Sequence, residues 1–169
     1  MEHIKYISEG YGIRGINMDD RKILVAYFSC TSHTQALAKE ICEAVGGTLF
    51  EIKTVNDYPE SYAGKIAVGG KEKLTNTRPE ILNTVADMDT YDTIMVGFPV
   101  WFSTCPMAII SFLEEYDMTG KTIYPFYTSG GGSGSRAIRD IEKAVPYADV
   151  MMCYNASKYG TSALEQWME

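Results

Sequence analysis

The sequence predicts an α/β fold in which helices cover both faces of a doubly wound parallel sheet. Apolar, β-rich segments alternate with segments whose apolar residues recur at helical spacing, and this alternation is typical of right-handed βαβ units. The chain has 169 residues, 46% of them hydrophobic and 22% charged, which suits one globular domain. Three segments that follow predicted strands have unusual polar, aromatic or glycine-rich sequences. They indicate a site at one edge of the sheet.

The first half of the pattern begins with a strand, a helix and a second strand. Residues 22–28 are β-rich and apolar on both faces, as in a strand inside a parallel sheet. The apolar residues from Leu37 to Val45 recur at helical spacing, and Gly46-Gly47 ends this helix. Residues 48–52 form the second predicted strand.

Segment 53–79 interrupts the alternation. It contains Pro59, Pro79 and glycines at positions 64, 69 and 70, which disfavour any long helix. We therefore expect it to be largely loop, with at most short helical pieces. A connection of that length in a compact domain is usually functional or mobile.

The second half returns to alternating strands and helices. Three further strands are predicted at residues 93–97, 121–127 and 150–154. Helices are predicted at residues 106–116, 135–145 and 162–168. Residues 1–20 show no sustained period, so we treat them as an N-terminal arm or leader and place the domain at residues 21–169.

Charge and apolar runs exclude several classes of protein. Lys plus Arg is 15 against 22 for Asp plus Glu, a net charge of −7, and this argues against nucleic acid because phosphate backbones need a basic face. The longest apolar run, residues 23–28, has six residues and is too short to cross a membrane. Residues 1–20 have no apolar stretch like that of a secretory signal. The four cysteines form no C-x-x-C pair. We expect a cytoplasmic protein.

The first unusual segment lies between the first strand and its helix. Residues 29–34, Ser-Cys-Thr-Ser-His-Thr, place four hydroxyls within six positions. Together with the free N–H groups of a helix start, they suit a phosphate monoester. A helix cap uses only one or two hydroxyls, so we prefer phosphate binding over capping alone.

The other two segments follow the third and fourth strands. Residues 98–106 place Trp101 among aromatic residues and prolines, which fits a platform for a flat ring and an ordinary core position equally well. Residues 128–135 have glycine at four of the five positions 130–134, so that backbone N–H groups approach a ligand closely. A flexible linker would be out of place between a strand and its own helix. Together the three segments predict a flat cofactor with a phosphate tail.

This ordered set of motifs resembles the flavodoxin-like family, and in particular its short-chain bacterial flavodoxin branch. The resemblance covers residues 21–169. It rests on ILVAYFS with the hydroxyl-rich loop after it, on YDTIMVGFPVWF at 91–102 and on TSGGGSGS at 128–135. It implies a flavodoxin-like five-stranded parallel sheet of order 2-1-3-4-5, with helices on both faces, that binds FMN without a covalent link.

The resemblance also implies which residues bind FMN. The phosphate would be held by Ser29, Thr31, Ser32, His33 and Thr34. The isoalloxazine would be lined by Pro99, Val100, Trp101 and Phe102, with Trp101 stacked on it. Its pyrimidine edge would be met by the backbone of Thr128, Ser129, Gly130 and Gly131. Ser32 stands where the family usually has glycine, and the third loop lacks the tyrosine that covers the second ring face in many flavodoxins. That face is open, or covered by Tyr58 or Tyr62.

Three functions are compatible with these residues. The chain is an electron carrier that docks with redox partner proteins through its acidic surface, an NAD(P)H-dependent oxidoreductase that reduces a small acceptor such as a quinone, or an interaction module without flavin. In the first two, the redox chemistry belongs to the flavin and no catalytic side chain is expected. Negative surface charge predicts a low reduction potential.

Two other chemistries are excluded by the residues that the sequence lacks. A cysteine phosphatase built on Cys30 would need an arginine at position 36, which is Ala36. The two histidines, His3 and His33, cannot form a metal cluster. The oligomeric state is left open.

Overall fold

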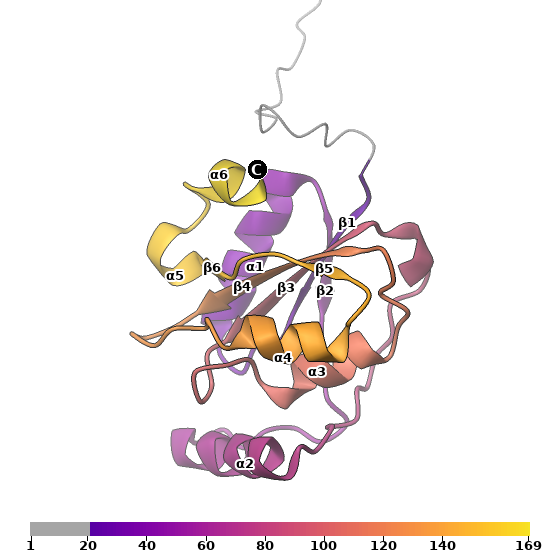
Figure 1. Cartoon of the computed structure of the whole chain (residues 1–169). Helices are drawn as coiled ribbons and strands as arrows, with labels where there is room; N and C mark the ends of the chain where they lie inside the picture. The colour runs from indigo at the N-terminus through magenta and orange to yellow at the C-terminus, as the bar shows by residue number, and fades with distance from the viewer. Residues whose placement is uncertain (1–20) are drawn as a thin grey trace, which may run out of the picture.

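The computed structural model describes residues 21–169 and shows a central parallel sheet between layers of helices (Figure 1). The strands are β1 Ile23–Tyr27, β2 Thr48–Glu51, β3 Thr93–Pro99, β4 Thr122–Thr128, β5 Asp149–Val150 and β6 Tyr154–Asn155. The helices are α1 Ser32–Val45, α2 Tyr62–Thr75, α3 Met107–Glu114, α4 Ala137–Ala144, α5 Ala156–Tyr159 and α6 Leu164–Met168, and a 3-10 turn spans Met88–Thr90. The predicted arm at residues 1–20 lies outside the described residues.

The sheet has the predicted order, β2-β1-β3-β4-β5, and its pairs are parallel. The register places Tyr27 beside Gly97, and Pro99 beside Thr128. β1, β3 and β4 therefore end at the same edge. Because ligands of such sheets bind beyond the carboxyl ends of the strands, the three unusual loops all leave the sheet where a ligand is expected.

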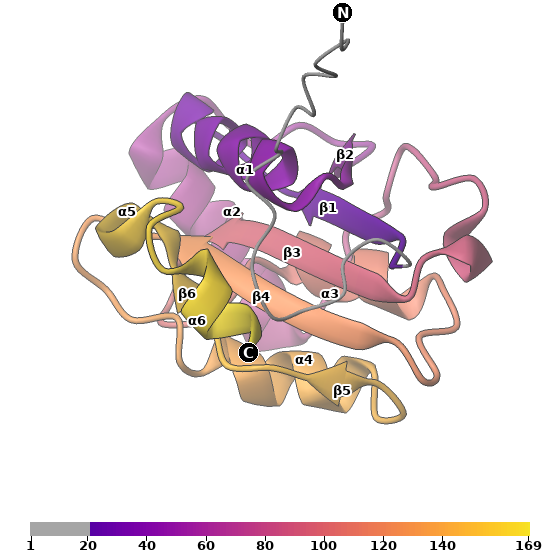
Figure 2. The ribbon, with the colours of Figure 1, turned by 90° about the horizontal axis from the view of Figure 1, so that it is seen from above.

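Helices cover both faces of the sheet, as predicted. Alternate residues of β1 belong to separate apolar clusters, with Leu24 and Ala26 in one and Ile23 and Val25 in the other, because successive side chains of a strand point to opposite faces. α1 and α6 pack in the second cluster, and α3 and α4 pack in the first. Figure 2, seen from above, shows α1 and α6 on one side of the sheet and α3 and α4 on the other.

The fifth predicted strand is two short pieces in the structure. β5 pairs with β4 through residues 149 and 150, and β6 pairs with β4 again through residues 154 and 155. Between them the chain leaves the ladder: the side chain of Met152 is 78% exposed, and its carbonyl accepts a hydrogen bond of 2.6 Å from the Trp167 indole. The predicted last helix is likewise shortened to α6, with α5 preceding it.

The prediction that residues 53–79 are largely loop is wrong, because α2 runs through 14 of them. Ser61 caps its start by accepting a hydrogen bond from Gly64 N–H. Glycine propensity argues against this helix, but tertiary packing requires glycine in it. A Cβ added at Gly69 would lie 2.8 Å from Cε3 of Trp101, and one added at Gly70 would lie 3.1 Å from Cζ of Phe102. α2 therefore docks closely on the second loop.

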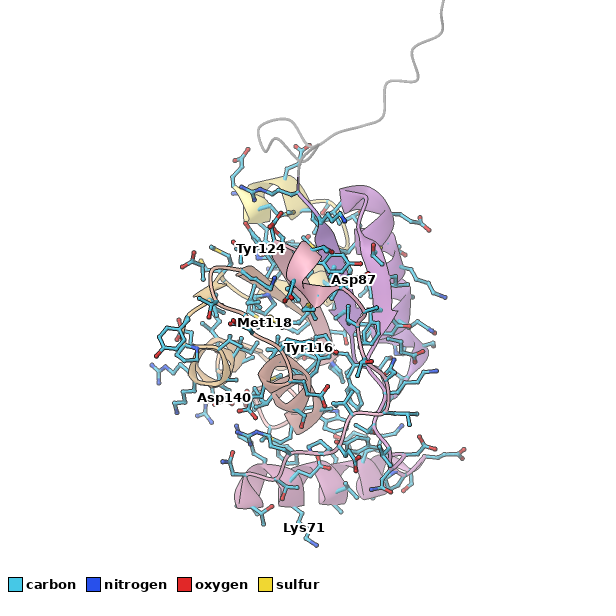
Figure 3. The ribbon with its side chains drawn as sticks, turned by 90° about the vertical axis from the view of Figure 1, so that its right-hand side faces the viewer. Lys71, Asp87, Tyr116, Met118, Tyr124 and Asp140 are labelled. Atoms are coloured by element: carbon cyan, nitrogen blue, oxygen red, sulfur yellow. The ribbon has the colours of Figure 1, made fainter. Side chains whose placement is uncertain are left out.

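α2 lies outside the two layers that flank the sheet. In Figure 1 it sits below α3 and α4, and in Figure 3 Lys71 points from its outer side away from the rest of the fold. Within the described part of the chain, no helix has the length and apolar character needed to cross a bilayer.

Candidate functional site

The first loop is closed by its own side chains at the start of α1. The Ser29 hydroxyl donates to the Thr31 carbonyl, and the Thr31 hydroxyl lies 3.4 Å from Nδ1 of His33. Thr31 is the N-cap residue, yet its side chain makes no capping hydrogen bond, and the first turn of α1 has no acidic residue. The first N–H groups of α1 are therefore not satisfied by a side-chain cap. This arrangement favours an anion over capping alone.

Ser32 begins α1 without backbone strain. The residue usually found there in the family is glycine, which would matter only if the position needed a positive φ. Among the described residues, the non-glycine positions with positive φ are Asn76, Asp87, Phe102 and Ser103. Ser32 is not one of them, so this departure from the family pattern costs no left-handed strain.

A lysine from α2 adds positive charge to the first loop. Nζ of Lys65 donates a hydrogen bond of 3.2 Å to the Cys30 carbonyl. Burial raises the pKa of the Cys30 thiol to about 11, although the charge of Lys65 opposes the rise. The thiol is therefore protonated at neutral pH and a poor nucleophile. Lys65 places its charge where the phosphate of a cofactor is expected.

Hydrogen bonds join the third loop to the other two. The hydroxyls of Thr34 and Thr128 share a buried hydrogen bond of 2.7 Å, which connects α1 to the end of β4. Val100 N–H donates to the Thr128 carbonyl at 3.0 Å. The three predicted loops thus meet around Thr128. Because its side chain is buried, Thr34 connects the loops from inside.

The second loop is a tight turn that exposes one aromatic ring and partly buries another. The backbone groups of Trp101 and Thr104 exchange hydrogen bonds of 2.9 and 3.0 Å. Phe102 and Ser103 between them have φ of 53° and 63°, a conformation that costs energy for residues other than glycine. The Phe102 side chain is 44% exposed and rests on Gly70.

Trp101 belongs to an aromatic cluster beneath the second loop. Its ring centroid lies 5.9 Å from that of Phe28 and 5.3 Å from that of Tyr58, and both pairs meet edge to face. Tyr58 also packs edge to face on Phe28, at 5.4 Å, and its hydroxyl donates a hydrogen bond of 2.7 Å to Glu72. Trp101 therefore makes core contacts, and stacking of its ring on a flavin stays a prediction. Tyr62, the other candidate cover for the ring, is 80% exposed on α2.

Asp140 fastens the second loop from the side of α4. One of its carboxylate oxygens accepts hydrogen bonds of 2.6 Å from both Lys73 on α2 and Thr104 in the loop. Burial raises the pKa of this carboxyl, but the hydrogen bonds from Lys73 and Thr104 outweigh the burial and hold the pKa below its usual value. Asp140, labelled in Figure 3, therefore ties three segments together as a carboxylate.

Two cavities open beside the meeting point of the loops. The larger, about 620 Å³, lies past β1 and β2 between the first loop and the segment that leads to α2; its wall includes Ser29, Tyr58 and Lys65. The smaller, about 200 Å³, lies between the third loop and the start of α5 and includes Ser129, Gly132 and Lys158. Both are large enough to admit part of a small molecule.

Sequence reasoning missed the residues that α2 and α5 bring to this edge. Lys65 was missed because the three glycines of segment 53–79 predict a loop and not a helix. Lys158 and its neighbours at 155 and 157 follow a strand that the sequence predicts as one continuous run. The useful signal was Ser61, a residue type that caps helices, followed at the far end of the segment by the helix-favouring residues 71–74.

The solved structures with similar folds include two of nearly the same extent. A protein from Bacteroides eggerthii DSM 20697, assigned as a flavoprotein, is 31% identical, with 87% of this chain and 95% of that chain covered and a TM-score of 0.80. A flavoprotein from Lactobacillus acidophilus NCFM, solved in complex with FMN, is 20% identical, with 88% and 99% covered and a TM-score of 0.72. At 20% identity, the similarity to the Lactobacillus protein shows a shared fold and nothing more.

Among curated proteins, an NAD(P)H dehydrogenase (quinone) from Acidovorax ebreus (strain TPSY) is 32% identical over 96 residues. The alignment covers 56% of this chain and 46% of that protein. The chain thus spans about half the length of the curated relatives it matches. The model of the family described as Flavodoxin matches residues 22–169, nearly all of the part whose strand order and loops are described above. This chain belongs to the flavodoxin family.

Proposed function

We propose that this chain binds FMN non-covalently and transfers electrons through it. The observation that carries the proposal is the meeting of three loops around Thr128, where the uncapped start of α1, the second loop and the glycine-rich loop adjoin. FMN is a flat ring system with a phosphate tail, so it needs an anion site and a ring site next to each other along one edge of the sheet. The FMN complex of the similarly folded Lactobacillus protein supports the same cofactor.

Each part of the site has a defined task in this proposal. The N–H groups at the start of α1, with the hydroxyls of Thr31 and Ser32, bind the phosphate, and Lys65 balances its charge. In this proposal, the ring is lined by Pro99, Val100, Trp101 and Phe102. The third loop offers backbone groups to the pyrimidine edge. When bound, FMN supplies the electron transfer, and the protein supplies binding, orientation and electrostatics.

The test compares FMN with riboflavin, which lacks the phosphate. Calorimetric titration of the flavin-free chain should show FMN binding about 100-fold more tightly, because two charge-assisted hydrogen bonds contribute roughly 3 kcal/mol or more. Ser32→Asp, which places a carboxylate at the start of α1, should abolish this preference. Ala67→Asp, on the exposed side of α2, should leave it unchanged. A chain that binds neither flavin would be the interaction module instead.

A second candidate is reduction of a small acceptor such as a quinone, with NAD(P)H as the reductant. Two observations favour it: the curated relatives are named NAD(P)H dehydrogenase (quinone), and the cavity of about 620 Å³ beside the first loop has room for a small molecule. Anaerobic NAD(P)H consumption by the FMN-loaded chain, with and without a soluble quinone, distinguishes this enzyme from a carrier. A carrier alone gives no quinone-dependent consumption and needs a protein redox partner.

A further inference from the structure

The smaller cavity is formed by two segments that lie far apart in sequence. Ser129, Gly131 and Gly132 come from the loop after β4, and Asn155, Ser157 and Lys158 come from the end of β6 and the start of α5. The two segments are joined directly, because Ser129 N–H donates a hydrogen bond of 2.9 Å to Oγ of Ser157. This contact fixes the second segment beside the glycine-rich loop.

The polar groups that line this cavity are mainly hydrogen-bond donors. Oγ of Ser157 accepts from Ser129, which leaves its O–H free to donate. Oδ1 of Asn155 accepts from Lys158 N–H at 3.1 Å, which leaves the side-chain NH₂ free. Gly132 N–H donates to no group among the described residues. Such a set of donors suits an electron-rich or negatively charged group.

The cavity also carries a positive charge that no carboxylate of its wall neutralises. Among the six residues of the wall, Lys158 is the charged one. Its Nζ lies 4.9 Å from the centroid of the Tyr159 ring, and hydrogen bonding to Tyr159 raises the pKa of the ammonium group. Lys158 is therefore protonated at neutral pH. In a chain of net charge −7, this is a local reversal of sign.

We infer that this cavity receives the N1–C2=O edge of the flavin and that Lys158 stabilises the negative charge which two-electron reduction places there. The inference rests on the proposed FMN binding and adds Asn155, Ser157 and Lys158 to it. With FMN bound, a hydride from NAD(P)H would supply two electrons and one proton and leave NAD(P)⁺. The bound cofactor would then carry one additional negative charge, which the ammonium group of Lys158 would stabilise.

This assignment changes the expectation for the reduction potential. The net charge of the chain predicts a low potential, because like charges disfavour a negative product. A lysine in the cavity that receives this edge acts in the opposite direction, because a positive charge stabilises a negative product. It therefore binds reduced FMN more tightly than it binds oxidised FMN, which favours hydride acceptance from a nicotinamide.

The experiment measures the dissociation constants of oxidised and of anaerobically reduced FMN for the same protein. Lys158→Met should lower the preference for reduced FMN about threefold relative to the unmodified chain, the range measured for exposed charge pairs. Lys158→Arg keeps the charge and should keep the preference. Lys143→Met, on α4 at a different cavity, is the control for a lost surface charge and should also keep it.

The effect should shrink as the ionic strength rises from 0.01 to 1 M, because salt screens an exposed charge. An unchanged ratio of the two constants in Lys158→Met would overturn the inference, since a merely structural lysine has no reason to distinguish the two redox states. Failure of the unmodified chain to bind oxidised FMN would instead overturn the proposed function.

Discussion

The site at which the three loops meet around Thr128 has two sides that are held together by different kinds of interaction. On one side, which we call the aromatic side, Phe28, Tyr58 and Trp101 pack edge to face beneath α2. On the other, which we call the donor side, Ser157 and Lys158 stand exposed around a small cavity with free hydrogen-bond donors. The aromatic side is held by apolar contact, and the donor side by a few hydrogen bonds.

The stability of the fold and the binding of the cofactor therefore depend on different residues. Apolar area removed from water stabilises the fold whether or not a cofactor is bound. Exposed donors contribute little to the folded chain, since water satisfies them as well. We therefore expect changes on the aromatic side to unfold the flavin-free protein and changes on the donor side to weaken flavin binding with little loss of stability.

The largest expected effect follows from removing the Trp101 ring. Trp101→Ala should lower the free energy of unfolding of the flavin-free chain by about 3 kcal/mol, at the low end for large-to-small core changes because the ring is only partly buried. It removes the partner of Phe28 and Tyr58 and the surface on which α2 docks at Gly69. Urea unfolding followed by circular dichroism measures the loss.

Phe102→Ala is the matched control, because it removes the neighbouring aromatic ring of the same turn. That ring is 44% exposed, so its removal should cost less than about 1 kcal/mol. Equal, small losses for both variants would contradict the comparison. They would mean that Trp101 serves the flavin alone, and its loss would then appear in the FMN dissociation constant and not in the stability of the flavin-free chain.

The strands of the sheet and the glycine-rich loop of the donor side were predictable from short-range sequence signals, whereas Ser157 and Lys158 were not. The positions of the strands and of the three loops follow from apolar runs and from glycine and hydroxyl clusters, whose physical causes act within a few residues. The strand order, which those signals do not determine, is what the resemblance to the flavodoxin-like family implies, and the structure has it. Ser129 and Gly131 were placed correctly at the carboxyl edge for this reason. Their cofactor roles stay predictions.

The aromatic side was not predictable in the same way, because its structure depends on distant contacts. Gly69 counts against a helix when only its neighbours in sequence are considered. In the folded chain the same residue lets α2 approach Trp101, which is 32 residues further along. Lys65 reaches the first loop from that helix, and Glu72 of the same helix accepts a hydrogen bond from the Tyr58 hydroxyl.

Asp140 offers a test of how firmly the aromatic side is fastened. Its pKa is held below the ordinary value of 3.8, so its carboxylate stabilises the fold above that pH and the contribution is lost as the pH falls through the lowered value. Asp140→Asn should therefore cost about 1 kcal/mol at pH 7, and the difference from the unmodified chain should vanish in acid. Asp149→Asn, an exposed carboxyl at β5, is the control. A cost that stays the same from pH 7 down to acid in which Asp140 is protonated would show that its charge is not what joins Lys73 and Thr104.

The smallest expected change in stability lies on the donor side, at Ser157. Ser157→Ala removes the acceptor of Ser129 N–H, but that N–H is exposed and regains a partner in water, so unfolding should change by less than about 0.5 kcal/mol. FMN affinity should nevertheless fall roughly 3- to 10-fold, the effect of one hydrogen bond. Ser162→Ala removes another exposed serine hydroxyl, which donates a hydrogen bond to the Tyr159 carbonyl away from the cavity, and should leave FMN affinity unchanged. Loss of affinity in both variants would attribute the effect to the fold of the α5 segment, and the donors of the cavity would then have no separate role in binding.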